Sequence, residues 1–60
     1  MNSLAGKVSV VTGSTSGIGR GIAEHFARLG SNIVVHGRDR ADGFETVRRV
    51  EAAGRDAEYF

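Results

Sequence analysis

Three glycines, Gly13, Gly17 and Gly19, come directly after an apolar, β-branched run at residues 8–12. Glycine adopts positive φ without steric cost and, having no Cβ, lets a ligand or a neighbouring backbone approach closely. If a helix begins in this turn, its unpaired amides and its dipole form a binding site for an anion such as a pyrophosphate. Hydroxyl donors stand between the first two glycines, at Ser14, Thr15 and Ser16. A strand, a glycine turn and a helix in this order are typical of dinucleotide binding.

The elements that would hold this turn follow the order β-α-β-α-β. Residues 8–12 and 32–36 predict strands, and residues 16–29 predict a helix that ends before Gly30. Residues 37–43 predict a polar loop and the start of a second helix, which ends at Gly54, and residues 57–60 predict the beginning of a third strand. Strands alternating with helices imply an α/β fold with a parallel sheet. A turn whose glycines serve only packing is the alternative, but these flanking elements favour the nucleotide site.

Composition narrows the possible partners. The net charge is +1, which predicts no nucleic-acid partner and no anionic membrane surface. No apolar run approaches the ~20 residues that span a bilayer, so we expect no membrane segment and a cytoplasmic location. The chain has no cysteine, and His25 and His36 lack companion ligands, so we expect neither disulfide nor metal site.

The segment TGSTSGIG, residues 12–19, resembles the signature of the short-chain dehydrogenase/reductase family, and LAGKVSVVTG resembles the usual start of its first strand. The resemblance implies the β-α-β-α-β part of a doubly wound, parallel Rossmann-type sheet. It also implies hydride transfer between NAD(H) or NADP(H) and a small-molecule carbonyl or alcohol, in a homodimer or homotetramer. The cofactor-binding residues are then expected to be Gly13, Ser14, Thr15, Ser16, Gly17, Ile18, Gly19, Gly37, Arg38 and Asp39.

The end of the second strand predicts which cofactor binds. A carboxylate there accepts a hydrogen bond from the ribose of NAD, whereas an arginine accommodates the 2′-phosphate of NADP. Gly37 occupies the acidic position of NAD-preferring relatives and Arg38 follows it, which favours NADP. Asp39 offers an alternative acceptor for the NAD ribose if the loop shifts by one residue. Ser16 stands where some NADP-dependent relatives carry a basic residue.

The catalytic residues that the family resemblance implies are not in these sixty residues. The chain contains neither a Tyr-x-x-x-Lys pair nor an Asn-Ala-Gly segment, and Lys7 is its only lysine. We expect Tyr59 to be a packing residue of the third strand, and we assign no catalytic residue.

Residues 1–60 are therefore expected to be the amino-terminal part of one dinucleotide-binding domain, truncated at the third strand, with the remainder of that domain as partner. Both helices should lie on one face of the sheet, leaving the other face bare. The sequence favours an NADP-dependent enzyme similar to 3-oxoacyl-acyl-carrier-protein reductases. An NAD-dependent enzyme similar to 3-hydroxybutyrate dehydrogenases, a non-catalytic NADP-sensing module and an inactive fold fragment remain alternatives.

Overall fold

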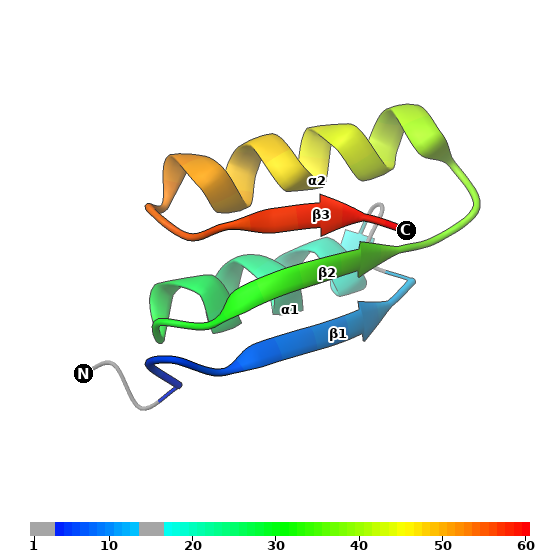
Figure 1. Ribbon diagram of the computed structural model, residues 1–60. Helices are drawn as coiled ribbons and strands as arrows, with labels where there is room; N and C mark the ends of the chain where they lie inside the picture. The colour runs from blue at the N-terminus through cyan, green and yellow to red at the C-terminus, as the bar shows by residue number, and fades with distance from the viewer. Residues whose placement is uncertain (1–3, 14–16) are drawn as a thin grey trace.

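The computed structural model describes residues 4–13 and 17–60, and within them five elements alternate between strand and helix (Figure 1). They are β1 (Val8–Thr12), α1 (Gly17–Arg28), β2 (Asn32–His36), α2 (Arg40–Ala52) and β3 (Ala57–Tyr59). β1 pairs with β2 and β2 with β3, both in parallel, so β2 is the central strand. The predicted α/β class and element order are confirmed, with boundaries within a few residues of those expected.

Glycines end both helices, as the sequence predicts. Gly30 has φ 104° and Gly54 has φ 87°, the left-handed conformation that closes a helix and that other residues adopt with strain. The amide of Gly30 donates to the carbonyl of Ala27 at 3.0 Å, and the amide of Gly54 donates to that of Glu51 at 2.9 Å. Each helix is thus terminated sharply enough for the next strand to begin within a few residues.

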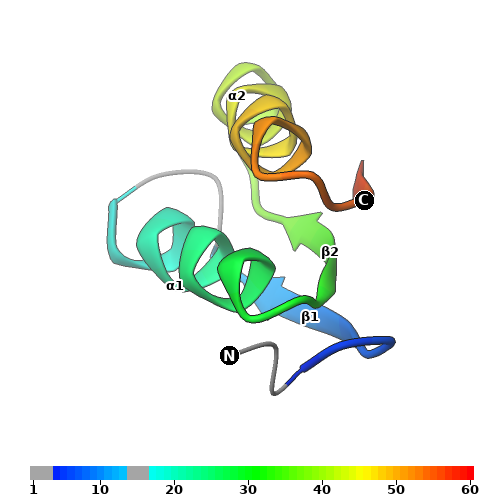
Figure 2. The same cartoon turned by 90° about the vertical axis from the view of Figure 1, so that its left-hand side faces the viewer.

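Both helices pack on the same side of the sheet, as Figure 2 shows. The core between the layers consists of three strand residues, Val11, Ile33 and Val35, and three helix residues, Ala23, Ala27 and Val50. Small alanines on α1 let the helix backbone approach the sheet closely. The larger Ile18 and Ile22, which lie at helical spacing in the sequence, are 84% and 41% exposed. The helix α1 therefore packs on the sheet through its alanines and not through these isoleucines.

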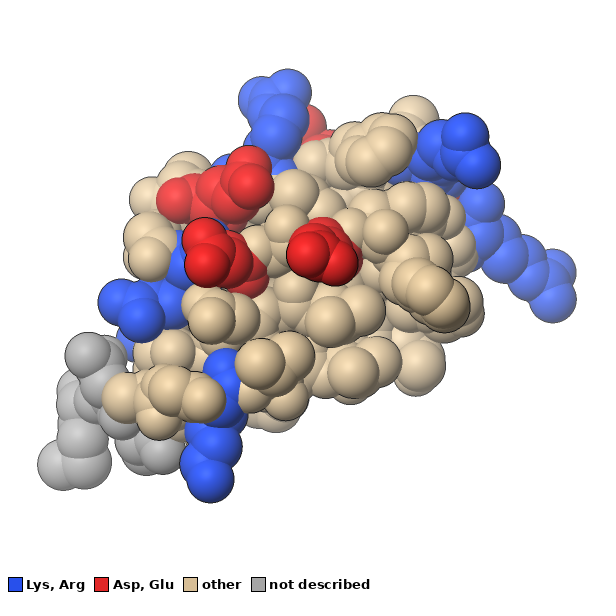
Figure 3. All heavy atoms as spheres, in the orientation of Figure 1, with Lys and Arg blue, Asp and Glu red and all other residues tan. Residues whose placement is uncertain are grey.

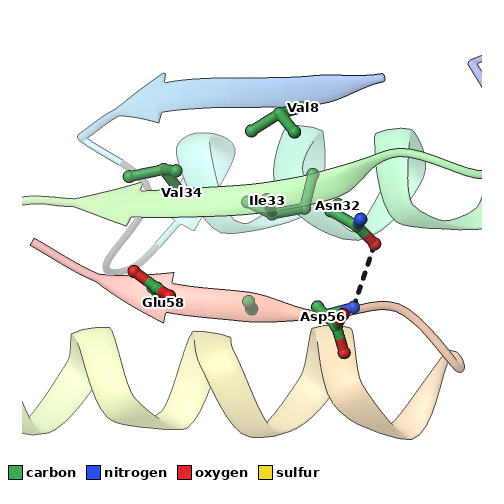
Figure 4. A pocket seen from close by; sticks show the side chains of 7 residues that line it. Val8, Asn32, Ile33, Val34, Asp56 and Glu58 are labelled. Atoms are coloured by element: carbon green, nitrogen blue, oxygen red, sulfur yellow. Dashed lines mark hydrogen bonds between the residues drawn. The ribbon is translucent and has the colours of Figure 1, made fainter. Parts of the chain in front are cut away.

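The opposite face of the sheet is open. Val8 and Val10 are each 66% exposed there, although the sequence pattern of β1 is that of a strand covered on both faces. Figure 3 looks onto this face, and most of the surface over the strands is neither acidic nor basic. A shallow hollow crosses it between β1, β2 and β3, where the side-chain oxygen of Asn32 accepts a hydrogen bond from the amide of Asp56 at 3.1 Å (Figure 4).

Candidate cofactor-binding site

The glycine turn and the loop before α2 lie at the same edge of the sheet. Thr12, the last residue of β1, is in register with His36, the last residue of β2. Gly13 and Gly37 therefore leave neighbouring parallel strands at their carboxyl ends. This is the edge at which open α/β sheets bind ligands.

The glycine turn has the backbone conformation that its sequence predicts. Gly13 has φ 68° and Gly17, the first residue of α1, has φ 61°, so both need glycine for their conformation. Among residues 4–13 and 17–60, apart from the chain neighbours and the nearby backbone of α1 itself, no atom lies within 4 Å of the place where a Cβ would stand at either position. Packing against this part of the chain therefore does not account for these two glycines.

Of the other residues predicted to form the turn, the structure describes Ile18 and Gly19. Gly19 lies in the first turn of α1 and is half-buried, and Ile18 beside it is largely exposed. Ser14, Thr15 and Ser16 lie outside the described residues, so their hydroxyl groups remain predicted donors. The exposed amino end of α1 thus offers backbone amides at the carboxyl edge of β1.

The loop from Gly37 to Asp39 presents one basic and one acidic side chain with different surroundings. Arg38 is exposed, and no carboxylate of residues 4–13 or 17–60 lies within ion-pair distance of its guanidinium. Asp39 is the N-cap of α2, where its Oδ1 accepts a hydrogen bond from the amide of Asp42 at 3.0 Å. Basic side chains project from this end of the molecule, beyond the carboxyl ends of the strands (Figure 3). The carboxylate of Asp39 is used within the fold, whereas Arg38 faces solvent.

Residues 7–60 match the family model described as short chain dehydrogenase. The chain belongs to the short-chain dehydrogenase family. It is 46% identical over 54 residues to the short-chain dehydrogenase/reductase SDRA of Arabidopsis thaliana, covering 90% of this chain and 21% of that protein. It therefore spans about a fifth of the length of that relative.

Two further relatives match shorter parts of this chain. The 3-oxoacyl-acyl-carrier-protein reductase FabG of Aquifex aeolicus is 62% identical over 34 residues, or 57% of this chain and 14% of its own. The D-beta-hydroxybutyrate dehydrogenase of Cupriavidus necator (strain ATCC 17699) is 59% identical over 39 residues, or 65% of this chain and 15% of its own.

Solved structures of reductases and oxidoreductases superpose closely on this chain. The promiscuous reductase LugOII, which catalyses a keto-reduction in lugdunomycin biosynthesis, superposes with a TM-score of 0.92 at 42% identity, over 98% of this chain and 25% of its own. A metagenomic short-chain oxidoreductase in complex with NADP superposes with a TM-score of 0.91 at 41% identity, over 97% of this chain and 26% of its own.

Tyr59, for which the sequence predicts only a packing role, contacts the predicted cofactor loop. Its ring lies over Gly43 of α2 and beside the Phe44 ring, with centroids 5.4 Å apart, and its hydroxyl donates to the carbonyl of Gly37. The register of β3 against β2 is the feature that indicates this contact, because Tyr59 pairs with Val35, two residues before Gly37.

Arg20 joins the beginnings of the two helices, and the sequence analysis did not identify this contact. Its Nε donates to Oγ1 of Thr46 at 2.9 Å, and one terminal nitrogen donates to the carbonyl of Asp42 at 3.1 Å. The fully buried Thr46 hydroxyl in turn donates to the same carbonyl at 3.1 Å. The first turn of α1, beside the glycines, is thereby tied to the first turn of α2, beside Arg38.

No helix among the described residues is long and apolar enough to cross a membrane.

Proposed function

We propose that this chain is the cofactor-binding, amino-terminal part of an NADP(H)-dependent short-chain oxidoreductase. When bound, the nicotinamide supplies or accepts the hydride that interconverts a carbonyl and a secondary alcohol. The observation that carries the choice of cofactor is the contrast between two neighbours. Arg38 is exposed at the carboxyl end of β2, while the carboxylate of Asp39 caps α2.

This contrast favours NADP because the two cofactors differ at the adenosine ribose. A guanidinium forms strong, bidentate hydrogen bonds to a phosphate, and Arg38 has no competing carboxylate among the described residues. Recognition of the NAD ribose would require a carboxylate at this edge. Asp39 is exposed too, but its Oδ1 accepts from the Asp42 amide, so only its Oδ2 is left to accept from a ribose hydroxyl. Turning the whole carboxylate away from α2 would cost about 1 kcal/mol of helix stability.

The glycine turn suits the pyrophosphate of either cofactor. Gly13 and Gly17 have positive φ and no packing neighbour at the Cβ position among the described residues outside their own turn and α1, and α1 begins at Gly17 with amides that its own hydrogen bonds leave unpaired. The helix dipole adds a favourable interaction with negative charge at this end. Ser14, Thr15 and Ser16 are proposed as further donors.

The bare face of the sheet supports the proposal that the rest of a larger domain covers it. Val8 and Val10 expose two-thirds of their surface, and burial of such side chains stabilises a fold by about 1.5–3 kcal/mol each. The Arabidopsis thaliana relative is about five times, and LugOII about four times, longer than the segment that matches this chain. The catalytic residues of the proposed oxidoreductase would lie in that remainder.

The test of the proposed function compares two charge reversals in the full-length protein. Arg38→Asp should weaken NADPH binding about tenfold to hundredfold, because charge-assisted hydrogen bonds contribute about 1.5–3 kcal/mol. NADH has no 2′-phosphate, so its dissociation constant should change little. Arg40→Asp is the matched control, since it makes the same charge change two residues away, at the first residue of α2. Equal weakening of NADPH and NADH by Arg38→Asp would refute the assignment.

An NAD-dependent enzyme similar to 3-hydroxybutyrate dehydrogenases is the second candidate, favoured by the 59% identity to the Cupriavidus necator enzyme. Tighter binding of NADH than of NADPH by the unaltered protein would select it. A Tyr-x-x-x-Lys pair in the remainder of the protein would exclude the non-catalytic sensing module, and a full-length protein without one that still binds NADPH would favour that module.

A further inference from the structure

Tyr59 fixes one atom of the predicted cofactor loop from outside that loop. Its hydroxyl donates to the carbonyl oxygen of Gly37, and that oxygen belongs to the peptide unit that joins Gly37 to Arg38. A peptide unit is planar, so holding its oxygen fixes the orientation of the whole unit. The hydrogen bond therefore determines the direction in which the chain enters Arg38.

Gly37 makes this anchor necessary. Glycine has the largest range of accessible φ and ψ, so the peptide unit after it rotates more freely than after any other residue. Gly37 lies just beyond β2 and has no strand pairing of its own. Within the described residues, the Tyr59 hydroxyl is the side-chain group that holds the Gly37 carbonyl.

The Tyr59 ring is itself held in place. The ring lies against the buried Gly43 on α2, where any larger residue would displace it. Phe44 packs beside it at 5.4 Å between centroids. The next residue, Phe60, donates its amide to the carbonyl of Val35 at 2.8 Å, which keeps β3 aligned with β2 up to this point.

The far side of Arg38 is fixed as well. Asp39 caps α2, and its carbonyl accepts a hydrogen bond from the amide of Gly43 at 2.8 Å. Arg38 therefore stands between two anchored backbone units while its side chain faces solvent. Holding a binding group in place before the ligand arrives reduces the entropy lost on binding.

We propose that Tyr59 is a positioning residue that orients Arg38 toward the cofactor 2′-phosphate and so contributes to the preference for NADP(H) over NAD(H). The proposal rests on the proposed function, because it takes Arg38 as the residue that recognises the 2′-phosphate. Tyr59 itself contacts no cofactor in this proposal. It acts through the Gly37 carbonyl.

The experiment measures dissociation constants of NADPH and NADH for the full-length protein and for three variants. Tyr59→Phe keeps the ring and removes only the hydroxyl, so the packing on Gly43 is retained. Ser9→Ala is the matched control: it removes a hydroxyl hydrogen-bonded to Oγ of Ser31 at 2.7 Å, on a strand away from the loop. Arg38→Asp tests the proposed function in parallel.

Tyr59→Phe should raise the NADPH dissociation constant about fivefold, the effect of one neutral hydrogen bond, and leave that of NADH within about twofold. Ser9→Ala should change neither dissociation constant, although it should lower the melting temperature about as much as Tyr59→Phe does. An unchanged NADPH constant in Tyr59→Phe, or an equal change for both cofactors, overturns the positioning role even if Arg38→Asp behaves as expected. If Arg38→Asp weakens both cofactors equally, the proposed function fails and the positioning role fails with it.

Discussion

Replacing Gly43 with alanine tests the packing that holds Tyr59 in place. Gly43 lies within α2 and is buried, and a Cβ built on it would overlap the Cδ1 and Cε1 atoms of the Tyr59 ring. Alanine is favoured over glycine in a helix interior by about 1 kcal/mol. Against this, overpacking a buried site costs about 1–3 kcal/mol. Displacing the ring also breaks the hydrogen bond to Gly37, a further loss of about 1 kcal/mol.

The balance is a net loss of about 2 kcal/mol in the free energy of unfolding, measured by urea denaturation of the full-length protein. Gly21→Ala is the control, because Gly21 is an exposed glycine within α1 with nothing within 4 Å of an added Cβ. That variant should be stabilised by about 1 kcal/mol. The two substitutions make the same chemical change, and they should move stability in opposite directions.

A double-mutant cycle sharpens this test. In a Tyr59→Ala background the added methyl group of Gly43→Ala has room, so its cost should disappear and the helix preference should remain. If Gly43→Ala alone is as stable as Gly21→Ala, Tyr59 does not pack against Gly43 as the structure has it. The Tyr59 ring would then not be held in the position from which its hydroxyl reaches the Gly37 carbonyl.

Two further substitutions test other parts of the site. Gly17→Ala should destabilise the protein by about 1–2 kcal/mol, because φ 61° is strained for alanine even where the described residues leave room for a Cβ. It should weaken NADPH and NADH alike, and a neutral effect on melting temperature would refute the left-handed conformation. Asp39→Ala should lower the free energy of unfolding by about 1 kcal/mol, because the cap of α2 is lost. The ratio of NADPH to NADH affinity should stay unchanged. A selective loss of NADH binding would instead show that Asp39 contacts the ribose.

The order and type of the elements could be predicted because local signals agree with the tertiary structure. The β-branched runs, the helical periodicity and the glycines at positions 30 and 54 each depend on neighbours in sequence. The edge of α1 that faces the sheet could not be predicted in the same way. Hydrophobicity favours Ile18 and Ile22, but close approach to a sheet favours the small side chains of Ala23 and Ala27.

In the candidate site, too, features that depend on local sequence could be predicted, and contacts between distant residues could not. The positive φ of Gly13 and Gly17 follows from residue type and context, so the sequence predicts it. The role of Tyr59 depends on a backbone carbonyl 22 residues earlier, and only the register of β3 against β2 brings the two together. Likewise, the sequence alone places Asp39 beside a possible ribose, and only the conformation at the start of α2 shows that its carboxylate is already hydrogen-bonded.

The Arg20 contact has a consequence for engineering cofactor preference by loop exchange. A segment grafted from a relative would normally be chosen from the end of β2 to the first turn of α2. Such a graft would replace Asp42, whose carbonyl accepts from Arg20, and would set a new backbone beside the retained Arg20 and Thr46. The segment to be exchanged is therefore discontinuous. The loop must be exchanged together with the residue at the position of Arg20 on α1 and the residue at the position of Thr46, one turn further along α2. Exchanges that move the loop alone would remove the Asp42 carboxylate, 3.9 Å from the Arg20 guanidinium, and would shift the backbone carbonyl that accepts from it.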